Sequence, residues 1–151
     1  MQPNERIVVY HDRSCPICRA EMEELKKIDG GDVLTLVDCS STDFADADAA
    51  EAGLDQRMLM SAMYIRVGSD HWLQGPDAFE YIYDQLGMPK MAAFWGSKRL
   101  RPLINVGYRL FARTRGFLAL FGVGHIVRWY VRREAQKAAQ RATHCERDSD
   151  A

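Results

Sequence analysis

The sequence predicts an α/β fold, in which a mixed β-sheet with flanking helices is followed by a basic helical C-terminal extension. Over the first 88 residues, short runs rich in β-branched and aromatic residues alternate with helical patterns. Proline and glycine stand where those helices should begin and end. The chain has 151 residues, of which 47% are hydrophobic, enough for one domain with its own core and an appendage.

The chain opens with a strand followed by a helix. "RIVVYH" (6–11) is typical of a buried strand, and the next helix should begin at Pro16 and stop at Gly30 and Gly31. An apolar stripe is expected from Ile17, Ala20, Leu25 and Ile28, with Met22 near its margin. The side chains expected to face water are Glu21, Glu23, Glu24, Lys26 and Lys27.

The next elements complete the sheet. "DVLTLVDC" (32–39) has little polar alternation, which indicates a strand covered on both faces, and residues 40–62 predict one or two short helices. Residues 63–67 and 71–75 predict a hairpin, and a helix should run from Pro76 to Gly87. The order β-α-β-α-β-β-α is a thioredoxin-like arrangement, with the first two strands parallel and the hairpin antiparallel. We assign it residues 5–88.

The rest of the chain differs in charge. Residues 1–97 carry 8 Lys/Arg and 17 Asp/Glu, whereas residues 98–133 carry 9 Lys/Arg and no acidic residue. This basic stretch should contact something anionic, either the acidic part of its own fold or an outside partner. We predict a helical extension over residues 89–142, broken near Pro102 and Gly116, and a disordered tail over residues 143–151.

Two interpretations of the extension stay open. The favoured one is a pair of amphipathic helices packed on the domain. The other is peripheral contact of residues 98–133 with an anionic membrane. In that arrangement Arg109, Arg113 and Arg115 would face lipid phosphates, and the inserted side chains would be Phe111, Phe117, Leu118 and Phe121. The 12 uncharged residues between Arg115 and Arg128 are fewer than the roughly 20 that span a bilayer.

Two cysteines, Cys15 and Cys18, form a C-x-x-C motif just after the first strand. The N-terminus lacks the apolar run of a secretory signal, so we expect a cytoplasmic protein with reduced thiols. Cys15 should cap the helix, where free N–H groups and the helix dipole stabilise a thiolate, with Cys18 one turn on. We therefore predict Cys15 as the nucleophile and Cys18 as the resolving thiol. His11 and Arg13 should add positive potential.

The resolving thiol must lose a proton, and a carboxylate is the natural acceptor. Asp12, just past the first strand, is the first candidate. Asp38 ends the neighbouring strand and is the second candidate, although a loop cap is the favoured interpretation for it.

Other uses of the cysteines have less support. Zinc usually needs four ligands, and only Cys39, His144 and Cys145 could add to the motif. The alternative function is a non-enzymatic membrane-surface adaptor that binds lipid through the basic helical segment and uses the cysteines as a redox sensor. Both thiols could also be inert core residues, which is the interpretation we favour for Cys39. The sequence contains no phosphate-binding loop or dinucleotide fingerprint, so we expect no cofactor beyond the dithiol. A protein or small-molecule disulfide is the expected substrate, and no nucleic-acid partner is expected.

Four segments in order resemble the DCC family of thiol-disulfide oxidoreductases. They are "YHDRSCPICRAEMEEL", "VLTLVDCSS", "SAMYIRVGSDHWLQGPDAFEYIYDQLG" and "YRLFARTRG", and the resemblance runs from about Ile7 to about Gly116. It implies a thioredoxin-like fold, protein-disulfide reductase activity, and a site at Asp12, Cys15 and Cys18.

The chain departs from the expected pattern at two positions. The family often has glycine after the aspartate, where this chain has Arg13. No proline precedes "MYIRV", so the cis-proline that faces the cysteines in thioredoxins is absent here.

Overall fold

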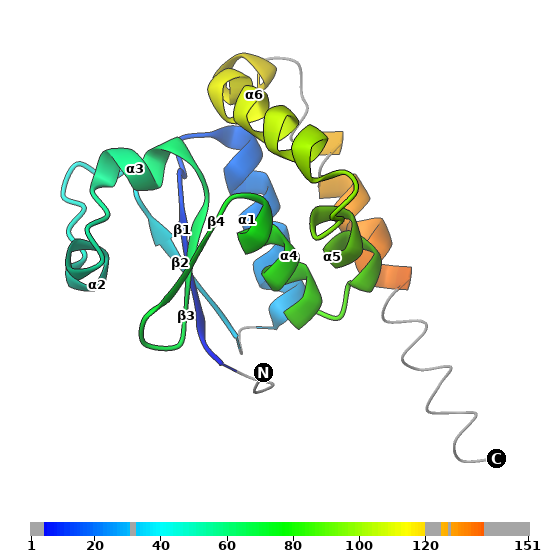
Figure 1. Cartoon of the computed structure of the whole chain (residues 1–151), viewed down its shortest axis with the longest axis horizontal. Coiled ribbons are helices and arrows are strands. Elements are labelled where there is room, and N and C mark those ends of the chain that lie inside the picture. Colours follow the sequence, from blue (N-terminus) through cyan, green and yellow to red (C-terminus); the bar gives the residue numbers. More distant parts are fainter. Residues whose placement is uncertain (1–4, 31–32, 120–124, 127, 138–151) are drawn as a thin grey trace.

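A four-stranded mixed sheet forms the centre of the molecule (Figure 1). The computed structural model describes residues 5–30, 33–119, 125–126 and 128–137. The strands are β1 (Ile7–His11), β2 (Leu34–Asp38), β3 (Tyr64–Val67) and β4 (His71–Gln74), in the spatial order β2-β1-β3-β4. β1 and β2 are parallel, and the β1/β3 and β3/β4 pairs are antiparallel. The predicted thioredoxin-like α/β fold is confirmed.

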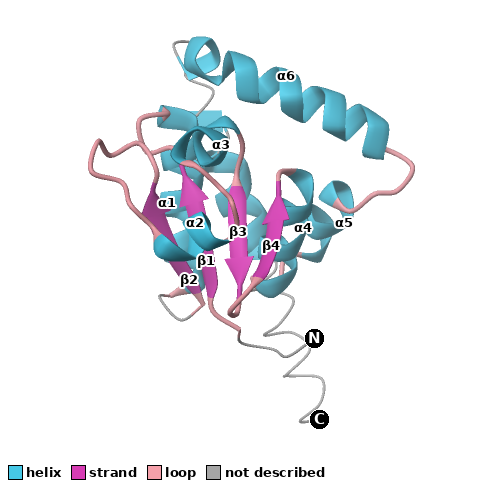
Figure 2. Cartoon of the chain, turned by 60° about the vertical axis from the view of Figure 1, so that its left-hand side comes forward, coloured by secondary structure: helices cyan, strands magenta, loops and turns pink. Residues whose placement is uncertain are grey.

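Helices cover both faces of the sheet (Figure 2). α1 (Pro16–Asp29) and α4 (Pro76–Gln85) lie on one face, and the short α2 (Ala47–Glu51) and α3 (Gln56–Ser61) lie on the other. α5 (Pro89–Trp95) and α6 (Arg101–Ala119) follow, and residues 128–137 are helical. α1 begins at Pro16 and ends before the left-handed Gly30, as predicted.

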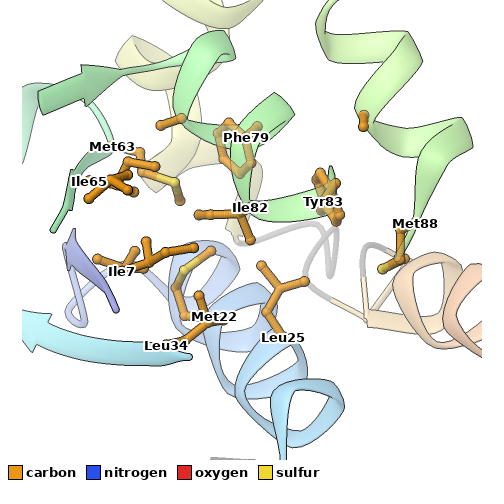
Figure 3. Close-up of a cluster of buried hydrophobic side chains, with 14 of the residues drawn as sticks. Ile7, Met22, Leu25, Leu34, Met63, Ile65, Phe79, Ile82, Tyr83 and Met88 are labelled. Atoms are coloured by element: carbon orange, nitrogen blue, oxygen red, sulfur yellow. The ribbon is translucent and has the colours of Figure 1, made fainter. Parts of the chain in front are cut away.

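Side chains alternate between two cores, as the strand period requires. Ile7 and Val9 of β1 point toward α1 and α4 and belong to the larger core (Figure 3). Tyr10, next along β1, belongs to a smaller core beneath α2 and α3. Because β1 is buried on both faces, it fixes the position at which the following loop begins.

The segment after residue 88 contacts the sheet domain. α5 packs on α4, where the rings of Phe79 and Trp95 stack with centroids 4.7 Å apart. Val131 is 1% exposed and belongs to the larger core. α6 crosses the end of the sheet at which β1 ends and α1 begins (Figures 1 and 2). The predicted boundaries at residues 88 and 142 stay predictions.

Two expectations for α1 were wrong. Glu24 does not face water but is 4% exposed, because Arg132 donates a hydrogen bond from Nε to its Oε1 at 2.5 Å and Lys27 and Arg128 lie near Oε2. Glu21 is partly buried and accepts a hydrogen bond from Tyr83. Tyr83 lies 62 residues from Glu21 along the chain, and Arg132 lies 108 residues from Glu24.

Several predictions for the extension fall on residues outside those the structure describes. They are the disordered tail over 143–151 and the lipid-facing role of Phe121. For Arg115, Phe117 and Leu118 the structure describes the helical backbone but not the side chains, so their lipid-facing roles stay predictions. Within the described part of the chain, none of the helices has both the length and the apolar character needed to cross a bilayer.

Candidate active site

Cys15 is the N-cap residue of α1, as predicted from Pro16. Its backbone is extended (φ −79°, ψ 115°), and its carbonyl accepts the first helical hydrogen bond, from Arg19 N at 2.9 Å. Cys15 is 5% exposed and Cys18 is partly buried. Cys15, Cys18 and Cys39 are all in the reduced, thiol form. Cys15 therefore lies at the positive end of the helix dipole, at the end of α1 where the first-turn N–H groups have no partner within the helix.

Asp12 organises the loop between β1 and α1. Its Oδ1 accepts hydrogen bonds from Ser14 N at 3.0 Å, Ser14 Oγ at 2.5 Å and Cys15 N at 3.3 Å. Asp12 is itself buried. A carboxylate that accepts these bonds fixes the backbone of Cys15, so Asp12 positions the predicted nucleophile.

Asp38 caps the adjacent loop, as favoured from the sequence. Its Oδ1 accepts from Ser40 N at 2.8 Å, Ser40 Oγ at 2.6 Å and Arg13 N at 3.3 Å. Burial acts to raise the pKa of Asp38, but the hydrogen bonds from Ser40 and Arg13 outweigh it and lower the pKa. A carboxylate held ionised in this way accepts protons poorly.

Cys39 is a core residue, as predicted. It is fully buried in the smaller core, and burial raises the pKa of its thiol to about 12. A thiol with so high a pKa carries almost no thiolate at neutral pH.

A small cavity of about 30 Å³ lies at the centre of the site. That volume is enough for a water molecule. The end of β1 and one side of α1 line it, together with Phe79 of α4 and the inner side of α6. The lining residues are His11, Asp12, Cys18, Glu21, Ala62, Met63, Phe79, Tyr108, Phe111 and Ala112. The cavity therefore brings Cys18 together with two carboxylic acids.

Glu21 is the residue of this cavity that sequence reasoning missed. Tyr83 Oη donates a hydrogen bond to Glu21 Oε1 at 2.8 Å. Burial raises the pKa of Glu21 to about 7, a larger effect than the opposing one of the Tyr83 hydrogen bond. Glu21 follows Cys18 by three residues, and this i, i+3 spacing, which puts both on one face of α1, was the available signal.

His11 does not provide the positive potential expected of it. Burial lowers the pKa of His11, more than the nearby Asp38 raises it. The imidazole is thus neutral at neutral pH. Its Nδ1 is buried with no hydrogen-bond partner among the described protein atoms, and the residue lines the cavity. Arg13 is exposed, so its charge is well screened.

Met63 stands directly before β3, where thioredoxins have the cis-proline. The described residues contain no cis peptide bond. Met63 N donates to Tyr108 Oη at 2.8 Å, and Met63 O accepts from Gly75 N at 2.8 Å. Both main-chain groups of Met63 are thus used within the fold, one of them by α6.

Among the residues that the structure describes, no three His, Cys, Asp or Glu side chains are grouped as a metal site would require. His144 and Cys145, which the zinc interpretation needs, lie outside those residues.

Comparison with known proteins identifies the family of this chain. The family model described as DCC1-like thiol-disulfide oxidoreductase matches residues 9–120. An uncharacterised chloroplastic protein of Arabidopsis thaliana is 25% identical over 113 residues, which cover 74% of this chain and 52% of that protein. This chain thus spans about half the length of that relative. No solved structure matches. Because the family match extends from β1 through the cysteine loop into α6, the resemblance seen in the sequence is confirmed, and the chain belongs to the DCC1-like thiol-disulfide oxidoreductase family.

Proposed function

We propose that the protein is a thiol-disulfide oxidoreductase of the protein-disulfide reductase type. The observation that carries this proposal is the position of Cys15 at the N-cap of a 14-residue helix, with Cys18 in the next turn beside a cavity lined by carboxylic acids. A thiolate at a helix N-terminus is stabilised by the helix dipole. The dithiol itself carries the electrons, so the reaction needs no further cofactor, and it suits a reducing compartment such as the cytoplasm.

The reaction divides into two exchanges. The Cys15 thiolate attacks one sulfur of a substrate disulfide, forming a mixed disulfide and releasing the first substrate thiolate, which takes up a proton. Cys18 then loses its proton and attacks the Cys15 sulfur, which releases the second substrate thiolate and leaves a Cys15–Cys18 disulfide. Two electrons pass to the substrate, and an external dithiol reduces the protein again.

The structure suggests separate roles for the two acids of the cavity. Asp12, predicted as the proton acceptor, accepts hydrogen bonds from the cysteine loop and so positions Cys15. Glu21 has a pKa of about 7, so both its protonated and ionised forms are populated at neutral pH. A general base works best when its pKa lies near the operating pH. In our proposal Glu21 takes the Cys18 proton, directly or through a water in the cavity, and Asp12 holds the loop.

Trapping of the mixed disulfide tests the assignment of the two thiols. With a disulfide-bonded protein such as insulin as substrate, a Cys18→Ser variant should accumulate a covalent adduct through Cys15. A Cys15→Ser variant should form none. Cys145→Ser is the control and should turn over normally. Equal trapping by both single variants, or by neither, would contradict the assignment.

The pH dependence of alkylation is a second test. Cys15 should react with iodoacetamide at pH values at which a free cysteine, with a pKa of about 8.5, is mostly protonated. A reaction profile like that of free cysteine would count against a helix-stabilised thiolate.

A further inference from the structure

The outer face of α6 carries a row of exposed aliphatic side chains. Leu103, Val106 and Leu110 are 69%, 63% and 61% exposed. Their spacing of three and four residues puts them in one line along the helix. Burial usually removes such side chains from water, so a continuous exposed row points to a binding surface.

This row continues into an apolar groove of about 290 Å³ beside α6. Phe94 and Leu100 line the groove and are 51% and 43% exposed, and Leu103 belongs to both the row and the groove. We call the five exposed side chains of the row and the groove the α6 surface. Phe111, which the sequence predicted as a membrane-inserted side chain, lines both this groove and the cavity beside Cys18.

Exposed positive charge borders the α6 surface. Lys98 and Arg99 precede α6, and Arg109 and Arg113 lie along one edge of the row. All four are exposed, and none forms an ion pair with an acidic side chain in the described part of the chain. Arg101, by contrast, pairs with Asp77 and Glu80.

We propose that the α6 surface binds the face of an anionic lipid bilayer, with the aliphatic row at the boundary between headgroups and acyl chains. An aliphatic stripe edged by arginines suits a helix that lies in that interface. A second copy of the chain fits less well, because it would bring the same four positive charges against each other. The surface lies outside the dithiol cavity, so this inference does not depend on the proposed redox activity.

Sedimentation of the full chain with vesicles tests the proposal. The protein should bind vesicles of equal parts phosphatidylcholine and phosphatidylglycerol, and far less to phosphatidylcholine alone. Added salt should weaken the binding. Absence of binding to the anionic vesicles would overturn the proposal. So would binding that depends on neither lipid charge nor salt concentration.

Two sets of variants separate the apolar and charged contributions. Replacing Leu103, Val106 and Leu110 by glutamine should weaken binding by about tenfold or more. Arg109→Gln and Arg113→Gln should each weaken it about fivefold at low salt. The controls, Arg57→Gln and Met58→Gln, alter exposed side chains of α3 and should bind as the unaltered protein does.

Further measurements distinguish loss of binding from loss of folding and from self-association. Circular dichroism should show that the glutamine variants keep their helices, and Cys15→Ser should bind vesicles normally. Self-association of the unaltered protein that the triple glutamine variant abolishes, without vesicle binding, would assign the surface to a second copy. Equal loss of binding in the α3 controls would also overturn the proposal.

Discussion

At the scale of single residues, Glu21 should affect both the second exchange step and the pH dependence of stability. Its carboxyl faces the cavity beside Cys18 and is hydrogen-bonded by Tyr83. We expect Glu21→Gln to slow the attack of Cys18 on a preformed mixed disulfide by about 10²-fold, the usual effect of losing a general base. In the unaltered protein that rate should rise through pH 7, whereas in the variant the rise should be absent. Stopped-flow release of a labelled thiol measures the step.

Glu23→Gln, on the exposed side of the same helix, is the matched control and should leave the rate unchanged. A Glu21→Gln rate equal to that of the control would remove Glu21 from the mechanism and return Asp12 to the role of proton acceptor.

The same carboxyl predicts a pH dependence of stability. Its pKa is 4.5 ordinarily and about 7 in the fold, so the folded state binds the proton more tightly than the unfolded state does. The free energy of unfolding should therefore fall as the pH rises from 4.5 to 7. Glu21→Gln removes this fall, so the variant should gain about 1–3 kcal/mol relative to the unaltered protein across that window. Urea unfolding at several pH values measures it, and parallel curves would contradict the prediction.

Among the elements, the helix of residues 128–137 is held to the domain by the buried Val131 and by ion pairs that Arg128 and Arg132 form with α1. Val131 is buried in the larger core, so Val131→Ala should lower the free energy of unfolding by about 2 kcal/mol. Ile126→Ala, at a position 65% exposed, should change it by less than about 0.5 kcal/mol. Thermal unfolding compares them, and equal effects would contradict the docking of this helix.

The ion pair between Arg132 and Glu24 should make its own, pH-dependent contribution to the free energy of unfolding. Arg132→Gln removes the hydrogen-bonded partner of Glu24 but leaves Lys27 and Arg128 near its other oxygen, so the free energy of unfolding should fall at neutral pH. Burial alone would raise the pKa of Glu24, but the bond from Arg132 and the nearby positive charges lower it. The contribution is thus present above the ordinary pKa and lost as the pH falls through the folded one. Urea unfolding should show the two proteins converging in acid.

Over the whole molecule, what the sequence could predict depended on the range of the interactions. The order of strands and helices along the chain and the helix start at Pro16 follow from local periodicity and from the positions of proline and glycine, and both were confirmed. The burial of Glu24 could not be predicted, because its partner Arg132 lies 108 residues away. A charged residue in a helix is predicted to be exposed, because the local sequence does not show whether a distant residue of opposite charge pairs with it.

Gly75 shows how closely α6 approaches the sheet. Its φ of +59° favours glycine, and a Cβ there would lie 3.1 Å from Tyr108 Cε1. Gly75→Ala should therefore cost more than Gly87→Ala, at φ +67° with open space around it, by about 1 kcal/mol or more. In a Tyr108→Ala background the difference between the two costs should shrink in urea unfolding. An unchanged difference would show that Tyr108 is not the obstacle.

The hydrogen bond from Met63 N to Tyr108 Oη helps to hold α6 against the domain, so access of substrate should depend on how many molecules have α6 displaced. Cys15 is 5% exposed and α6 packs against α1, so we expect a bulky disulfide to reach Cys15 only in the fraction of molecules whose α6 has moved aside. The apparent dissociation constant is then the intrinsic one divided by that fraction. At saturating substrate the rate of the first exchange should approach the opening rate of α6, so that chemically different protein disulfides share one maximal rate while a small, slim disulfide exceeds it.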